Sequence, residues 1–146
     1  IDKQGYVWFC RIGADMLGRL DPKTGQIDDL RTGPGSAPRR MAVGPDGTLW
    51  VTAYGNGKLI KVDPRERKVI KEYAMPAGGS AGPYAVTVDG AGRVWANEID
   101  TDTVALFDPG AENFVSSSCR PAASASARPL STPRAATGTW AVTTGV

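Results

Sequence analysis

An internal repeat constrains this sequence more than any other feature. Three tryptophans lie 42 and 45 residues apart, and each follows a glycine by three residues and precedes an Asp-Pro pair by thirteen: Trp8, Trp50 and Trp95. Pro38 and Pro83 each stand twelve residues before a tryptophan. Repeats of about 20 to 50 residues are typical of arrays in which each unit packs on its neighbours. We therefore expect a chain of similar units.

The central unit has the apolar alternation of β-strands and not the periodicity of helices. Glycine and aspartate separate its segments, because they adopt the backbone angles that tight turns require. Four strands are predicted in this unit, over residues 40–43, 48–52, 58–62 and 68–73. Charged residues gather around the last of them, as suits an outer strand facing water. Four antiparallel strands in about 43 residues match one blade of a β-propeller.

The predicted fold class is therefore all-β, a β-propeller of four-stranded antiparallel blades with about two and a half to three blades present. The first unit lacks an inner strand, because residues 5–7 lead directly into Trp8. The third unit is expected to run from Tyr84 to Phe107 and then to lose its fourth strand. Closed propellers usually have at least about four blades. The remaining blades are therefore expected to be missing from this chain.

The chain is predicted to divide into blades over residues 1–114 and a tail over residues 115–146. Alanine, serine, threonine, proline and arginine make up most of the tail, which contains no acidic residue. One interpretation is a disordered low-complexity segment. The other is a change of reading frame near Phe114, since one synonymous coding of residues 114–119 reads Arg-Leu-Val-Glu-Leu when shifted, like an outer strand. The encoding DNA would distinguish the two.

Composition and charge narrow the range of partners. The net charge of +2 comes from three arginines in the tail, because residues 1–114 hold 14 basic and 15 acidic side chains. This is a poor nucleic-acid signature, and no apolar run approaches the roughly 18 residues of a membrane span. The chain contains no histidine, which removes the commonest general base and metal ligand. The sequence begins at Ile1 and does not indicate a compartment.

The segments 7–22 and 44–50 resemble the streptogramin B lyases, also called virginiamycin B lyases, whose blades repeat similar Gly-Pro-Asp-Gly and Leu-Trp motifs. The resemblance covers roughly residues 1–114. It implies a seven-bladed propeller that linearises a cyclic depsipeptide antibiotic by Mg²⁺-dependent elimination. It also implies Mg²⁺ as cofactor and a small molecule or cyclic peptide as ligand.

The resemblance places the family's active histidines directly after the proline that opens a blade. Arg39 and Tyr84 occupy those positions here, so no catalytic residue is predicted. An acidic metal ligand follows the blade tryptophan by three or four residues, and only Glu98 fits that pattern. One carboxylate is too few for Mg²⁺, so this chain alone is not expected to bind the ion. Arg39, Tyr84 and Asn97 are the candidate ligand-binding residues.

Two functions remain open at this point. In the first, the chain is part of a carbon-oxygen lyase propeller and is inactive alone, since it has no histidine and an incomplete ring. In the second, it is a noncatalytic propeller similar to the NHL and lactonase types, which presents Arg39, Tyr84, Asn97 and Glu98 to a ligand or partner.

Overall fold

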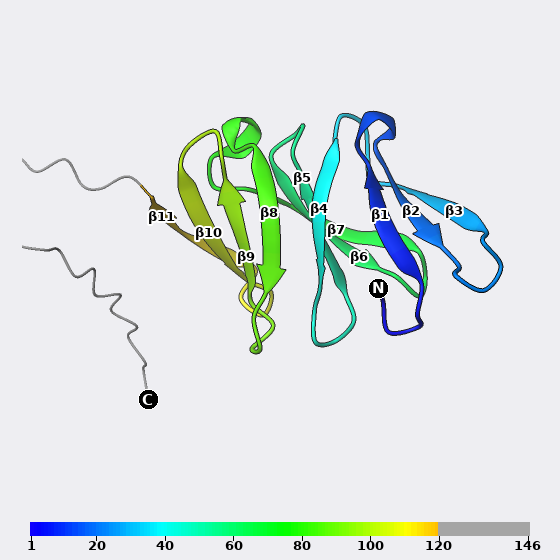
Figure 1. Cartoon of the computed structure of the whole chain (residues 1–146). Helices are drawn as coiled ribbons and strands as arrows, with labels where there is room; N and C mark the ends of the chain where they lie inside the picture. Colours follow the sequence, from blue (N-terminus) through cyan, green and yellow to red (C-terminus); the bar gives the residue numbers. More distant parts are fainter. Residues whose placement is uncertain (120–146) are drawn as a thin grey trace, which may run out of the picture.

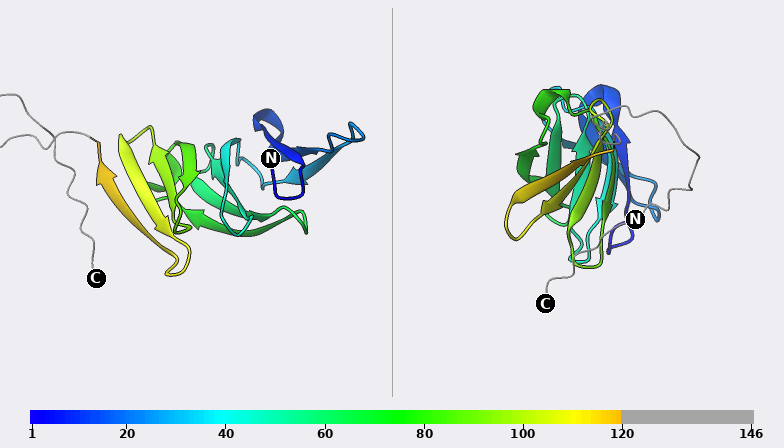
Figure 2. Two further views of the ribbon diagram at one scale, coloured as in Figure 1. Left: turned by 60° about the horizontal axis from the view of Figure 1, so that its bottom comes forward. Right: turned by 90° about the vertical axis from the view of Figure 1, so that its left-hand side faces the viewer.

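The computed structural model describes residues 1–119, which are almost entirely β-structure. Eleven strands form three antiparallel sheets, and the remaining regular elements are the short 3₁₀ helices η1 (Ile12–Ala14) and η2 (Gly78–Ser80). The sheets follow one another along the molecule as an open arc (Figures 1 and 2). None of the helices in this part of the chain is long and apolar enough to cross a membrane.

Each sheet is one blade whose strands are hydrogen-bonded in chain order. Blade 1 consists of β1 (Val7–Arg11), β2 (Met16–Leu20) and β3 (Ile27–Arg31). Blade 2 consists of β4 (Pro38–Val43), β5 (Leu49–Ala53), β6 (Lys58–Asp63) and β7 (Lys68–Ala74). Blade 3 consists of β8 (Pro83–Val88), β9 (Val94–Glu98), β10 (Thr103–Asp108) and β11 (Asn113–Ser118). The predicted all-β propeller arc is confirmed, including the absence of an inner strand from blade 1.

The expectation that the third unit loses its fourth strand is wrong. Strand β11 pairs with β10 along its whole length, from Asn113 opposite Asp108 to Ser118 opposite Thr103. The serines of β11 conceal it in the sequence, but strand pairing uses backbone groups that every residue except proline supplies. Phe114 also packs on Phe107, with ring centroids 4.7 Å apart. The predicted boundary at residue 114 therefore lies inside a strand, and the frame-change interpretation of the tail mostly concerns residues 120–146, outside the described chain.

The repeated glycine three residues before each tryptophan has a conformational cause. Gly5, Gly47 and Gly92 have φ angles of 90°, 91° and 82°. Each donates its N–H to the carbonyl three residues earlier, over 2.9 to 3.1 Å. A side chain is strained at such positive φ values, whereas glycine adopts them readily. The same turn thus places each tryptophan at the equivalent position of its blade.

The blades pack through two faces, and the core lies between them. We call the face that carries the tryptophan the forward face, and the opposite side of the same sheet the rear face. The forward face of blade 1 meets the rear face of blade 2, burying Trp8, Leu17, Leu49, Val51, Ala53, Ile60 and Val62. The forward face of blade 2 meets the rear face of blade 3, burying Trp50, Leu59, Val94, Ala96, Ala105 and Phe107. Strand alternation explains the division, because successive side chains point to opposite faces.

Candidate functional site

The candidate site lies on β4 and β8, the inner strands of blades 2 and 3, which run side by side (Figure 1). Pro38 and Pro83 open these strands, and Arg39 and Tyr84 follow them directly. The register of both strands shifts just after the proline, so each begins with an irregularity of the same kind. Such bulges redirect side chains. Equivalent residues of two blades are thereby brought to the same end of the arc.

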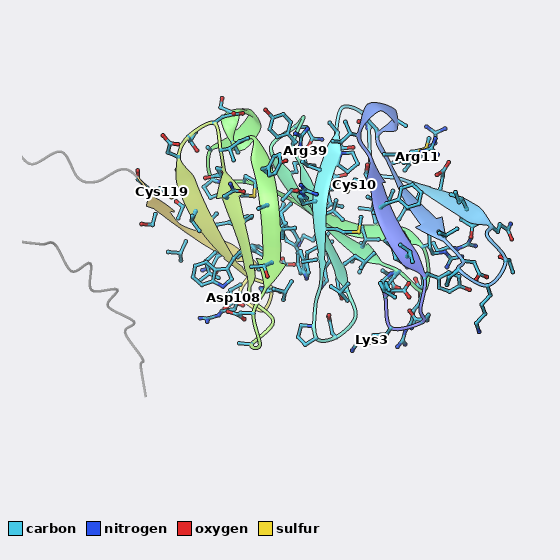
Figure 3. The ribbon with its side chains drawn as sticks, viewed as in Figure 1. Lys3, Cys10, Arg11, Arg39, Asp108 and Cys119 are labelled. Atoms are coloured by element: carbon cyan, nitrogen blue, oxygen red, sulfur yellow. The ribbon has the colours of Figure 1, made fainter. Side chains whose placement is uncertain are left out.

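Arg39 and Tyr84, at equivalent positions of adjacent blades, are in contact. The guanidinium carbon of Arg39 lies 4.6 Å from the centroid of the Tyr84 ring and 5.5 Å from that of Tyr54. Arg40 lies 5.5 Å from the Tyr84 centroid. Figure 3 shows Arg39 near the upper end of β4. Two cations therefore lie against one aromatic ring, a favourable arrangement because the ring face is electron-rich.

Sequence reasoning missed Arg40 and Tyr54. Arg40 was visible as the second arginine after Pro38, and strict strand alternation would have placed it on the opposite face from Arg39. The bulge removes that alternation, since the pairing of β4 with β5 shifts between Pro38 and Met41. Tyr54 follows the end of β5, and nothing in the sequence indicated which strand it would meet.

The cluster formed by Arg39, Arg40, Tyr54 and Tyr84 is electropositive. Within residues 1–119, neither Arg39 nor Arg40 forms an ion pair with a carboxylate. Hydrogen bonding and positive charge from Arg39, and then from Arg40, lower the pKa of the Tyr84 phenol. The two guanidiniums thus stabilise negative charge at this place. Planar guanidiniums are well suited to carboxylate and phosphate groups.

Asn97 holds the strand irregularity of blade 3. Its Oδ1 accepts the backbone N–H of Ala85 at 2.6 Å. Thr52, two residues after Trp50 as Asn97 is after Trp95, accepts the N–H of Arg40 at 3.1 Å. The Thr52 hydroxyl also lies 2.9 Å from the carbonyl of Tyr84, which links the two blades. Asn97 therefore positions the backbone beside Tyr84, and its contact with a ligand stays a prediction.

Glu98 is buried between blades 2 and 3, with 1% of its surface exposed. Its Oε1 accepts the N–H of Ala77 at 3.0 Å, from the loop before η2. Its Oε2 is also buried and has no hydrogen-bond partner in the described chain. No group of three or more acidic, cysteine or histidine side chains that could hold a metal occurs among residues 1–119. Mg²⁺ requires near-octahedral oxygen coordination, so the residues present do not fit it.

Three sheets that pack face to face, with the inner strands of blades 2 and 3 side by side, define the arc as part of a β-propeller. Solved structures of the streptogramin B lyase type share this fold. Virginiamycin B lyase from Staphylococcus aureus has a TM-score of 0.74 at 20% identity, covering 83% of this chain and 40% of the enzyme. A catalytically inactive variant of that enzyme with quinupristin has a TM-score of 0.73 at 26% identity, covering 85% of this chain and 41% of the variant.

Other comparisons match a different kind of protein or a shorter stretch of this chain. A putative 6-phosphogluconolactonase from Bacteroides fragilis has a TM-score of 0.63 at 18% identity, covering 80% of this chain and 38% of that one. An uncharacterized protein from Sulfolobus acidocaldarius is 42% identical over 40 residues, which are 27% of this chain and 14% of that protein. No protein-family model matches the sequence. The similarity to streptogramin B lyases is thus established for the fold, and the chain spans about two fifths of those enzymes.

Proposed function

We propose that this chain is part of a propeller of the streptogramin B lyase type, that it does not linearise a cyclic depsipeptide by itself, and that its inner strands bind an anionic group. The observation that carries the proposal is the contact of Arg39 with Tyr84. These residues occupy the positions where the resemblance places the active histidines. A cationic and aromatic cluster stands there instead.

The chemistry of the cluster suits binding better than elimination. An elimination requires a base that removes a proton and a group that stabilises the leaving oxygen. A guanidinium is a poor proton acceptor, so neither Arg39 nor Arg40 is suited to serve as the base. Each guanidinium instead carries about five N–H donors, so the two together offer about ten. A carboxylate or phosphate placed between them would gain charge-assisted hydrogen bonds.

Two experiments test the proposal. In the first, the purified 146-residue chain is incubated with quinupristin and Mg²⁺, and linear product is followed by mass spectrometry. We expect no product, and linearisation above a protein-free control would overturn the proposed inactivity.

In the second experiment, inorganic phosphate is titrated into the chain and into its Arg39→Gln and Arg40→Gln variants by calorimetry. We expect binding that each substitution weakens about tenfold, equivalent to about 1.4 kcal/mol. The matched control is Arg65→Gln, which removes an arginine from the turn after β6 and should bind like the unaltered chain. Equal binding by all four proteins would show that phosphate does not use this cluster.

A further inference from the structure

Among residues 1–119, nothing covers the forward face of blade 3. Trp95 is 37% exposed, whereas Trp50 and Trp8, at the equivalent positions of the other blades, are 2% and 8% exposed. Beside Trp95, the side chains of Val104, Leu106 and Val115 line a hollow of about 510 Å³. This face is apolar around its tryptophan, and at the positions paired with Trp95 and Leu106 it carries Leu106 and Val115 where blade 2 carries Lys61 and Lys71.

The same positions of the repeat form the forward face of each blade. The residue nine places after the tryptophan lies beside it in the core, as Leu17 follows Trp8 and Leu59 follows Trp50. In blade 3 the corresponding residue is Val104. The uncovered face therefore repeats the forward half of a blade junction.

Blade 1 carries the other half of such a junction. The rear faces of blades 2 and 3 use the residues one place before the tryptophan and 12 and 19 places after it, which are Leu49, Val62 and Val69, and Val94, Phe107 and Phe114. The same positions in blade 1 are Val7, Leu20 and Ile27. Ile27 is 56% exposed, and Val7 and Leu20 are half-buried.

We propose that two copies of this chain associate head to tail, with the forward face of blade 3 of one copy docking on the rear face of blade 1 of the other. The contact continues the junction that the chain already makes twice, at the same repeat positions. Head-to-tail contacts of this kind are heterologous. They form a closed ring of copies if the rotation from one copy to the next adds up to a full turn, and an open filament if it does not. Two arcs of three blades give six, within the range of about four to eight found in closed propellers.

A concentration series in analytical ultracentrifugation tests the association with the whole 146-residue chain. We expect the mass to rise from 15.3 kDa to multiples of that value. Val104→Asp places a charge in the forward face, and Ile27→Asp places one in the rear face. Each variant alone should stay monomeric. Ile70→Asp is the matched control, because Ile70 is an exposed isoleucine of β7 in blade 2, away from the two faces proposed to dock. This variant should associate like the unaltered chain.

Mixing the variants identifies which faces meet. A mixture of the Val104→Asp and Ile27→Asp chains retains one intact pair of faces, so we expect a dimer and nothing larger. Dimerisation of the Ile27→Asp chain alone would instead show that two forward faces meet, and dimerisation of the Val104→Asp chain alone would show that two rear faces meet. Either result, or an unaltered chain that remains monomeric at every concentration, would overturn the proposal. Val115→Asp, at a 65% exposed position beside the same hollow, replaces Val104→Asp if circular dichroism shows the latter to be unfolded.

Discussion

The carboxylate of Asp2 accepts a hydrogen bond from the indole Nε1 of Trp8 at 2.7 Å. The other oxygen of the same carboxylate accepts the N–H groups of Gln4 and Tyr6, each at 2.9 Å. Asp89 is bonded to the indole of Trp95 over 3.2 Å at the same repeat positions. An aspartate six residues before the tryptophan therefore anchors both the turn and the indole in two of the three blades.

Replacing Asp2 by alanine should destabilise the fold by about 2 kcal/mol, because buried donors would lose their acceptor. Asp2 is only 6% exposed, so water cannot readily take its place. The free energy of unfolding in urea measures the loss. Asp89→Ala is the comparison, and it should cost less because Trp95 lies at an exposed face. Equal losses from the two substitutions would contradict this explanation.

Two glycines with similar backbone angles should respond differently to alanine. Gly57 has a φ of 66°, and a Cβ there would lie 1.8 Å from the carbonyl oxygen of Gly78. Gly25 has a φ of 73° and open space around it. We expect Gly25→Ala to cost about 1 kcal/mol from the left-handed conformation alone. Gly57→Ala should cost more than about 2 kcal/mol, since backbone must also move. Urea unfolding of both variants tests this, and a Gly57→Ala chain as stable as Gly25→Ala would refute it.

Asp15 should make the stability depend on pH in the acid range. Its carboxylate accepts the N–H groups of Ala37 and Gly35, each at 2.8 Å, and these bonds, with the hydroxyl of Ser36, hold the pKa of Asp15 below its usual value. Because its pKa is lower in the folded state, ionised Asp15 stabilises the fold at pH values above its pKa in the unfolded chain, about 3.9. This stabilisation is lost as the pH falls through the pKa of Asp15 in the folded state.

The variant Asp15→Asn should therefore be less stable than the unaltered chain at neutral pH, and the difference should shrink as the pH falls below about 4. Thermal unfolding midpoints measured from pH 7 to pH 2 would show this. A difference that stays constant over that range would mean that the charge of Asp15 contributes nothing.

The two cysteines should differ in reactivity. Burial raises the pKa of the Cys10 thiol to about 11, an effect that the nearby positive charge of Arg40 only partly offsets. Cys119 is exposed. Since the thiolate is the reactive form, iodoacetamide at pH 8 should label Cys119 well before Cys10. A Cys119→Ser chain should react slowly until urea unfolds it. Rapid labelling of that folded variant would show that Cys10 is accessible and ionised.

The sequence was sufficient to predict the repeat, the blades and the position of Arg39 and Tyr84 at the openings of two blades. Glycine turns and strand alternation are local properties, and a repeat transfers them from one unit to the next. Equivalent positions in adjacent blades must also lie near one another. The contact of Arg39 with Tyr84 was not predicted, and it is seen only in the structure.

Only the tertiary structure showed the roles of Asn97, Glu98 and Arg40, and the presence of β11. Asn97 bonds to the irregularity of β8, and Arg40 lies in the equivalent irregularity of β4, next to Tyr84. Glu98 bonds to the loop before η2, which connects blade 2 to blade 3. Strand β11 forms because β10 offers it a complete row of backbone partners. Each of these outcomes depends on how one strand or loop meets another, which the residue pattern within a single segment does not determine.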